Sequence, residues 1–209
     1  MLPGQKAGLW WVFGEVILLE VWVLYERFHG LSWYRRRHIL RVSAVLEELA
    51  EHHGLDEQLS RWAGFGHDLA RECTRAELLE EATRLGLEVG PAEQDEPLLL
   101  HGPVAAAWLK AAGVANEAVW QAISLHTTAG PRMTDMAKAL YIADGVEPGR
   151  HFSGRQRLWE RAMEDLEAGF RAVLESSVHY AQQRSLPIHR DTQSALDEVI
   201  GAVKDSAEG

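Results

Sequence analysis

The chain has 209 residues, of which 46% are hydrophobic and 25% are charged. These proportions exclude a disordered or low-complexity protein, and the length fits one sizeable domain. The formal net charge is −10, which disfavours nucleic acid or an anionic membrane as a partner unless basic residues gather locally.

Near the N-terminus, residues 9–25 form a strongly apolar stretch that two glutamates, Glu15 and Glu20, interrupt. A charged side chain at the centre of a bilayer costs a few kcal/mol, about 2.5–3.5 on insertion scales. We therefore expect a helix that packs on the domain or on a second subunit rather than a membrane span. The tryptophans gathered before residue 34 suit a dimer interface, so a homodimer stays open.

Two smaller features bear on partners and on location. The basic run Arg35–Arg37, with Arg41 just beyond it, is interpreted as a solvated helix start rather than a nucleic-acid patch. Cys73 is the single cysteine and can form no internal disulfide, so a reducing, cytoplasmic setting is expected. No histidine or second cysteine lies near it at a metal-ligand spacing, and Cys73 is interpreted as structural.

In the first half of the chain, helical signals follow one another closely. Residues 38–53 carry apolar side chains at a spacing of three and four, and Gly54 ends this helix. Asp56 can cap a second helix that reaches about residue 72. Thr74 and Glu77 form a capping-box pattern ahead of a third helix, over 76–86.

The second half begins with a polar stretch, 87–97, that is predicted to be a loop. Helices are then expected over 101–113, 116–130 and 134–148, with Thr134 as a cap, followed by a long helix over 155–184 and a short one after Asp191. No alternating strand pattern and no dividing linker appears. The sequence therefore predicts an all-α, single-domain fold.

Several of these apolar helical settings contain residues that could hold a metal: His38, the adjacent pair His67 and Asp68, His101, His126 and Asp144. A metal ion that activates water prefers imidazole and carboxylate ligands, and a helical bundle supplies them from different helices. Gly64 and Gly66 indicate a close approach of backbone or substrate beside the pair. From the residues alone, hydrogen-bonded core histidines and a helix-capping Asp144 stay equally open.

The order of the motifs is more specific than any single one. They run "RRRH" (35–38), "GHDLA" (66–70), "LLHGPV" (99–104), "HTTAGPRMT" (126–134), "LYIADGVEPGRHFSG" (140–154) and "IHRDT" (188–192). This series resembles the YqeK family of the HD phosphohydrolase superfamily over about residues 24–200. The resemblance implies an HD-type helical bundle over 24–200, preceded by an extension over 1–23 and followed by a tail over 201–209.

The resemblance also implies an activity and a metal centre. Members of that family are symmetric bis(5′-nucleosyl)-tetraphosphatases, which cleave diadenosine tetraphosphate into two ADP. The implied metal ligands are His38, His67, Asp68, His101, His126 and Asp144. The implied metal is iron, as one or two ions, although manganese, cobalt and zinc suit the same donors.

The resemblance further assigns roles around a nucleotide substrate. Asp68, His101, His126 and Arg150 are the expected catalytic residues, with Asp68 accepting a proton from the attacking water. Thr127, Glu147 and Arg150 match the family's motifs at the phosphate end of the site, and Arg132 and Lys138 are further candidates for phosphate binding. Arg71 stands where the family commonly has lysine, which keeps the charge but changes its geometry.

Two other functions stay open. The HD fold hosts several phosphohydrolases, so the substrate could be another nucleotide. A non-catalytic nucleotide-binding regulatory module is the second alternative, although the complete ligand set disfavours it.

Overall fold

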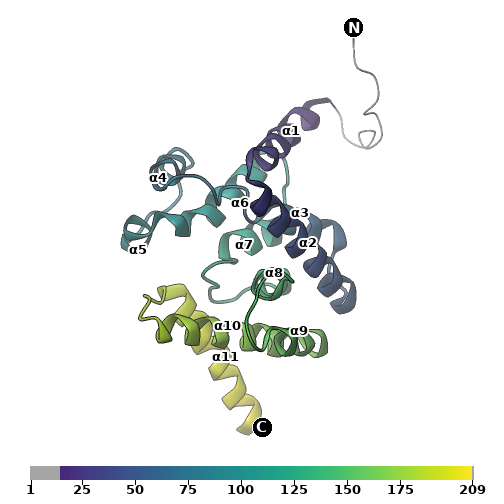
Figure 1. The fold of residues 1–209 in the computed structure, drawn as a ribbon, viewed down its shortest axis with the longest axis vertical. Helices are drawn as coiled ribbons and strands as arrows, with labels where there is room; N and C mark the ends of the chain where they lie inside the picture. The colour runs from purple at the N-terminus through teal and green to yellow at the C-terminus, as the bar shows by residue number, and fades with distance from the viewer. Residues whose placement is uncertain (1–14, 209) are drawn as a thin grey trace.

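A computed structural model of the chain describes residues 15–208, with the side chains of residues 21–201. This part of the chain forms eleven α-helices and one short 3₁₀ helix, η1, without a β-strand (Figure 1). The predicted all-α, single-domain fold is confirmed. The elements are α1 (Glu15–Gly30), α2 (Trp33–His53), α3 (Glu57–Gly66), α4 (Arg75–Arg84), α5 (Pro91–Asp95), η1 (Pro97–Leu100), α6 (His101–Ala111), α7 (Glu117–Leu125), α8 (Asp135–Val146), α9 (Arg155–Glu164), α10 (Leu166–Gln183) and α11 (Arg190–Glu208).

Local signals begin and end several helices as predicted. Gly54 takes a left-handed conformation directly after α2, and the Asp56 carboxylate accepts a hydrogen bond from an N–H in the first turn of α3. Thr74 and Glu77 form both halves of a capping box on α4. The Thr134 hydroxyl caps α8 by accepting a hydrogen bond from the N–H of Ala137, without a capping box. Each cap satisfies backbone groups that a helix end leaves without a partner.

The core lies between the central helices. α2 packs on α3 and α8, α7 packs on α3, α6 and α8, and α8 also contacts α10. Helix α1 lies at one end of the molecule and α11 at the other (Figure 1). A Cβ on Gly64 would lie 2.8 Å from Ser43 Oγ, and one on Gly66 would lie 2.7 Å from a Leu109 methyl carbon. Both glycines therefore permit close helix packing beside His67, as expected.

Four sequence predictions about element boundaries are wrong. The helix that begins at Glu57 ends at Gly66 instead of continuing to residue 72, and residues 67–72 form turns. The stretch 87–97 is not a plain loop, because it contains α5 and the start of η1. The predicted helix over 155–184 is two helices that break at Asp165, where the backbone is extended. The helix near the C-terminus has 19 residues and is not short.

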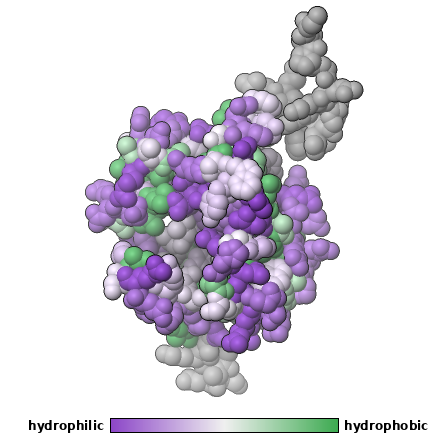
Figure 2. Space-filling model, in the orientation of Figure 1, coloured by the Kyte–Doolittle hydropathy of each residue, from purple (hydrophilic) through white to green (hydrophobic). Residues whose placement is uncertain are grey.

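The N-terminal apolar stretch lies partly outside the described residues, since the structure describes nothing before residue 15. The domain limits at residues 23 and 200 stay a prediction, and α1 and α11 each run across one of them. Among the described residues, no helix is long and apolar enough to cross a membrane. Figure 2 shows a face on which hydrophilic side chains predominate and hydrophobic ones form small separate patches.

Candidate metal centre

Five predicted site residues meet in the interior of the bundle. His38 belongs to the second turn of α2, His67 and Asp68 directly follow α3, His101 begins α6 and His126 follows α7. Each of the five is no more than 4% exposed. Asp144, near the end of α8, lies beside them at the wall of a cavity. Because five helices must pack correctly to assemble this group, it is a property of the tertiary structure.

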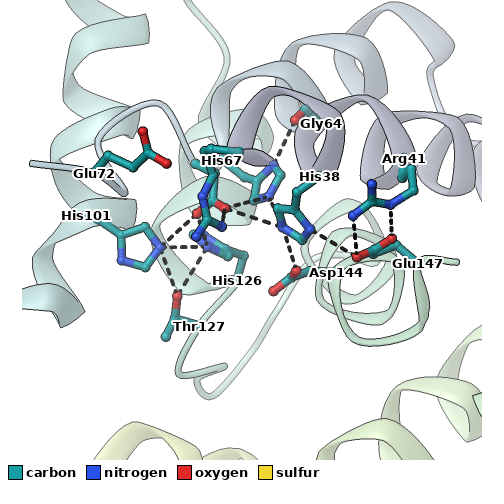
Figure 3. Close-up of polar contacts among 12 residues, drawn as sticks. His38, Arg41, Gly64, His67, Glu72, His101, His126, Thr127, Asp144 and Glu147 are labelled. Atoms are coloured by element: carbon teal, nitrogen blue, oxygen red, sulfur yellow. Dashed lines mark hydrogen bonds and ion pairs between the residues drawn. The ribbon is translucent and has the colours of Figure 1, made fainter. Parts of the chain in front are cut away.

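The donor atoms fall into two groups, and within each group they lie within 4.8 Å of one another. One group consists of His38, His67 and Asp144, and the other of Asp68, His101 and His126. Figure 3 shows the rings converging from both sides, with Asp144 next to His38 and with Thr127 below His101 and His126.

Asp68 connects the two groups, since its two carboxylate oxygens face opposite ways. Oδ2 lies 3.3 Å from Nε2 of His38 and 3.6 Å from Nε2 of His67. Oδ1 lies 3.2 Å from Nε2 of His101 and 3.7 Å from Nε2 of His126. A carboxylate placed in this way can contribute one oxygen to each group.

The electrostatics favour the protonation states that metal ligands need. Burial lowers the pKa of His67 to about 4, so this ring is neutral at neutral pH. Burial alone would raise the pKa of Asp68, but the surrounding histidines hold it well below its usual range. The pKa of Asp144 is likewise held low by its hydrogen bond to His38 and by the charge of Arg150, against the opposing effect of burial. Metals bind neutral imidazole and ionised carboxylate, so these three groups are ready to coordinate.

His38 is different, because its pKa is raised. Burial lowers this pKa, but the hydrogen bonds to Asp144 and Glu147 raise it by more. Its Nε2 lies 3.1 Å from Asp144 Oδ1, and its Nδ1 lies 3.2 Å from Glu147 Oε1. The ring therefore links the carboxylates on its two sides.

Three arginines surround the carboxylates. Arg35 donates a hydrogen bond to Asp68 Oδ2, and Arg150 Nη2 donates to Asp144 Oδ1 at 2.6 Å. Arg71 also lines the cavity. Arg150 was predicted for this site, whereas Arg35 and Arg71 were not. Their spacing in the sequence could have indicated that they lie near the site, since Arg35 precedes His38 by one helical turn and Arg71 follows Asp68 by three residues.

The remaining predicted residues lie in different surroundings. Thr127 lines the cavity, and its hydroxyl oxygen is 3.2 Å from His126 Nε2 and 3.4 Å from His101 Nε2. Glu147 is 2% exposed and contacts His38 and Arg41. It does not line the cavity.

The structure does not bring Lys138 or Arg132 to the cavity wall. Lys138 forms an ion pair with Glu167 at 2.5 Å. Arg132 is exposed in the loop before α8, and its backbone N–H donates to Glu198 at 2.9 Å. A contact with phosphate at the metal centre therefore has no geometric support for either residue.

The cavity has a volume of about 650 Å³, within the range of roughly 300–1,000 Å³ that small-molecule sites occupy. Its polar part contains the three arginines and every donor residue except His67, which lies behind the wall and is fully buried. Its apolar part comes from η1, from the loop before α9, and from α9 and α10. The larger apolar and aromatic side chains there are Leu98, Leu99, Phe152, Leu158 and Tyr180.

The residues present fit a two-metal centre. Imidazole nitrogens and carboxylate oxygens suit iron, manganese, cobalt and zinc, and each group offers three such atoms. Side-chain donors occupy only part of a normal coordination shell, and the adjoining cavity leaves room for water or substrate. The chemistry that such an arrangement supports is metal-assisted hydrolysis.

Comparison with known proteins assigns the family. The HD domain family matches residues 35–149, which is more than half of the chain. The chain belongs to the HD-domain family. A crystal structure of a predicted HD superfamily hydrolase from Clostridium acetobutylicum, described as involved in NAD metabolism, superposes with a TM-score of 0.82 at 30% identity and covers 87% of this chain and 97% of that one. The resemblance indicated by the motif order is confirmed.

Relatives of this HD-domain protein include two symmetrical bis(5′-nucleosyl)-tetraphosphatases. That of Bacillus subtilis is 31% identical, over 78% of this chain and 87% of the relative. That of Halalkalibacterium halodurans is 28% identical, over 81% of this chain and 91% of the relative. The matched length means that the likeness extends beyond the HD motifs to nearly the whole of both relatives.

Proposed function

We propose that this protein is a metal-dependent hydrolase that cleaves a dinucleoside tetraphosphate symmetrically into two nucleoside diphosphates. The observation that carries the proposal is the pair of donor groups bridged by Asp68 at the wall of a cavity that also presents three arginines. Two full-length relatives named for the same reaction support the choice of substrate.

The proposed metal ligands are His38, His67 and Asp144 for one ion and Asp68, His101 and His126 for the other. When bound, such ions lower the pKa of a coordinated water and neutralise charge on phosphate oxygens. Iron is the proposed metal, although manganese, cobalt and zinc suit the same donors. Asp68 is the proposed acceptor for the proton of the attacking water, because its carboxylate is ionised and both of its oxygens face the centre.

Arg35, Arg71 and Arg150 are the proposed phosphate-binding residues. Arg35 and Arg150 now pair with Asp68 and Asp144, the carboxylates that bound metal would neutralise. With these carboxylates coordinated to metal, both guanidinium groups would be available to bind the negative phosphoryl groups of the substrate. Arginine suits this task because its planar donors bind phosphate in a bidentate manner.

Thr127 and the apolar end of the cavity complete the proposed substrate site. The Thr127 hydroxyl can donate to a phosphate oxygen next to His101 and His126. Phe152 and Tyr180 are 43% and 53% exposed although they line the cavity. Exposed aromatic rings beside a phosphate site suit a purine base, since stacking on an aromatic face contributes about 1–3 kcal/mol per base.

The decisive experiment is product analysis. The purified protein is stripped of metal, reloaded with iron or manganese, incubated with diadenosine tetraphosphate, and the nucleotides are separated by chromatography. We expect ADP as the sole product. ATP together with AMP would keep a hydrolase but contradict symmetric cleavage, and no turnover with iron, manganese, cobalt or zinc would contradict the substrate.

Asp68→Asn should reduce turnover by more than about 100-fold, since even an outer-shell partner of a metal ligand is worth 10–100-fold. The amide keeps the shape of the side chain but loses the negative charge and the ability to accept a proton. Asp95→Asn, at an exposed position on α5, is the matched control and should leave turnover unchanged. Similar rates for both variants would contradict the role of Asp68.

The two alternatives differ in what this assay would show. A hydrolase specific for another nucleotide would turn over that nucleotide and lose the activity in Asp68→Asn. A nucleotide-binding regulatory module would bind substrate without turnover in any variant. The complete set of donors favours an enzyme over such a module.

A further inference from the structure

The four buried histidines of the metal centre differ in how their second ring nitrogen is held. Three of them place Nδ1 on the backbone carbonyl oxygen three residues earlier. These pairs are His67 with Gly64 at 2.8 Å, His101 with Leu98 at 2.5 Å and His126 with Ile123 at 2.7 Å. His38 instead places Nδ1 3.2 Å from a carboxylate oxygen of Glu147, which is distant in the sequence.

Helix position explains the difference between His38 and two of these histidines. His67 and His126 directly follow α3 and α7, where the last carbonyl groups of a helix lack an intrahelical partner and can accept from a side chain. His38 lies inside α2, with four more turns of helix after it. The carbonyl groups around it already accept helical hydrogen bonds, so its Nδ1 needs a partner from another element.

Glu147 is itself held firmly in place. Nε and Nη2 of Arg41 donate to its two carboxylate oxygens, Nη2 at 3.1 Å, and the backbone N–H of Gly149 donates to Oε2. The side chain is 3% exposed, does not line the cavity, and lies on the side of His38 opposite His101 and His126 (Figure 3). A Cβ on Gly149 would lie 2.4 Å from Arg41 Nη2, so only glycine permits the guanidinium group to approach so closely.

We propose that Glu147 is a positioning residue of the metal centre. It accepts the Nδ1–H of His38 and thereby orients the ring so that Nε2, the nitrogen that would bind metal, faces His67 and Asp144. Arg41 and Gly149 keep the Glu147 carboxylate in position. Carboxylate partners of this kind orient metal-bound histidines and increase their basicity. The inference rests on the proposed metal centre but not on the identity of the substrate.

The proposal replaces phosphate binding as the role of Glu147. A residue that binds phosphate must reach the cavity, whereas Glu147 reaches it only through the ring of His38. Its effect should therefore be confined to one of the two donor groups, since Glu147 contacts no member of the group formed by Asp68, His101 and His126.

The test uses zinc alone, without substrate, so its result is independent of whether the tetraphosphate is cleaved. Zinc binding to the full-length, metal-stripped protein is followed by calorimetry. For Glu147→Gln we expect one of two zinc sites to weaken by about 10–100-fold, while the other keeps its affinity. The matched control is Glu51→Gln, at an exposed position on the same helix as His38, which should leave both sites unchanged.

A second readout reports on the hydrogen bond itself. In the zinc-loaded, ¹⁵N-histidine-labelled protein, we expect a downfield, slowly exchanging Nδ1–H signal from His38 that is absent in Glu147→Ala. Gly149→Ala keeps the carboxylate but displaces Arg41, and should weaken the same zinc site to a lesser degree. Unchanged affinity at both sites in Glu147→Gln, or equal weakening of both, would overturn the proposal.

Discussion

Asp68 is a buried carboxylate that contacts residues from both donor groups. Its side chain is 3% exposed and lies within 4 Å of ring nitrogens from four histidines and of the Arg35 guanidinium group. A buried carboxylate without partners is costly, by several kcal/mol in effective terms. Arg35 places a formal positive charge next to Asp68. The same geometry that stabilises the carboxylate holds it ready for metal ions.

Cys73, the single cysteine, offers a test of local environment outside the metal centre. Burial raises the pKa of its thiol, and the nearby Glu77 carboxylate raises it further. A raised pKa leaves less thiolate, the reactive form, at any pH below it. We therefore expect alkylation by iodoacetamide at pH 8 to be slower in the native protein than in urea. The midpoint of the pH dependence of the alkylation rate in the native protein should lie above the ordinary thiol pKa of about 8.5.

The same protein in urea is its own control, because unfolding removes the burial and the neighbouring carboxylate together. Equal rates in the native and the unfolded chain, or a midpoint below the ordinary thiol value, would contradict this account of Cys73.

At the scale of elements, caps and breaks decide where site residues lie. α3 ends at Gly66, and residues 67–72 form turns. His67 keeps helical backbone angles, and its N–H donates to the Ala63 carbonyl group. Adjacent residues at a helix end of this kind project about 100° apart. His67 joins one donor group, and Asp68, which projects in a different direction, contacts both.

The break at Asp165 can be tested directly. Its carboxylate accepts the backbone N–H of Ala168 at 2.7 Å and caps α10. Asp165→Ala should lower the free energy of unfolding by about 1 kcal/mol, the usual value of an N-cap. Urea denaturation measures the change. Glu164→Ala, at the adjacent exposed position, should have little effect, and equal losses would contradict the capping role.

At the scale of the whole molecule, the metal centre joins helices that are distant in the sequence. The residues that could hold the metal come from α2, from α8, from the start of α6 and from the ends of α3 and α7. A ligand that binds only the folded state shifts the folding equilibrium in proportion to its affinity. Bound metal should therefore stabilise the entire domain.

We expect Mn²⁺ at about 100 times its Kd to add about 2.7 kcal/mol for each site that it fills. For a domain of this size, that corresponds to a rise in Tm of roughly 5–10 °C. Differential scanning calorimetry with Mn²⁺ and with chelator measures the shift. Asp144→Asn should show a smaller metal-induced shift, while Asp135→Asn, on the same helix with a side chain 67% exposed, should keep it. Equal shifts in both variants would exclude Asp144 as a ligand.

Local patterns in the sequence were sufficient for the helical fold and for several helix ends. Gly54, Asp56, Thr74 and Thr134 act at the positions predicted, because a cap depends on a few neighbouring residues. The break at Asp165 was missed for the converse reason. An aspartate within an apolar pattern is compatible with a continuous helix, and only the packing of α9 against α10 distinguishes the two outcomes.

For the site, the sequence by itself determined which histidines and carboxylates could serve as ligands, since motif order and donor chemistry are properties of the chain. Only the tertiary structure decided how they divide into two groups, that Asp68 connects them, and that Glu147 supports His38 from behind. The same helix packing places Arg35 in an ion pair with Asp68, and Lys138 in an ion pair with Glu167 outside the site. The physical reason is that these contacts join residues on different helices, and their distances are set by how the helices pack.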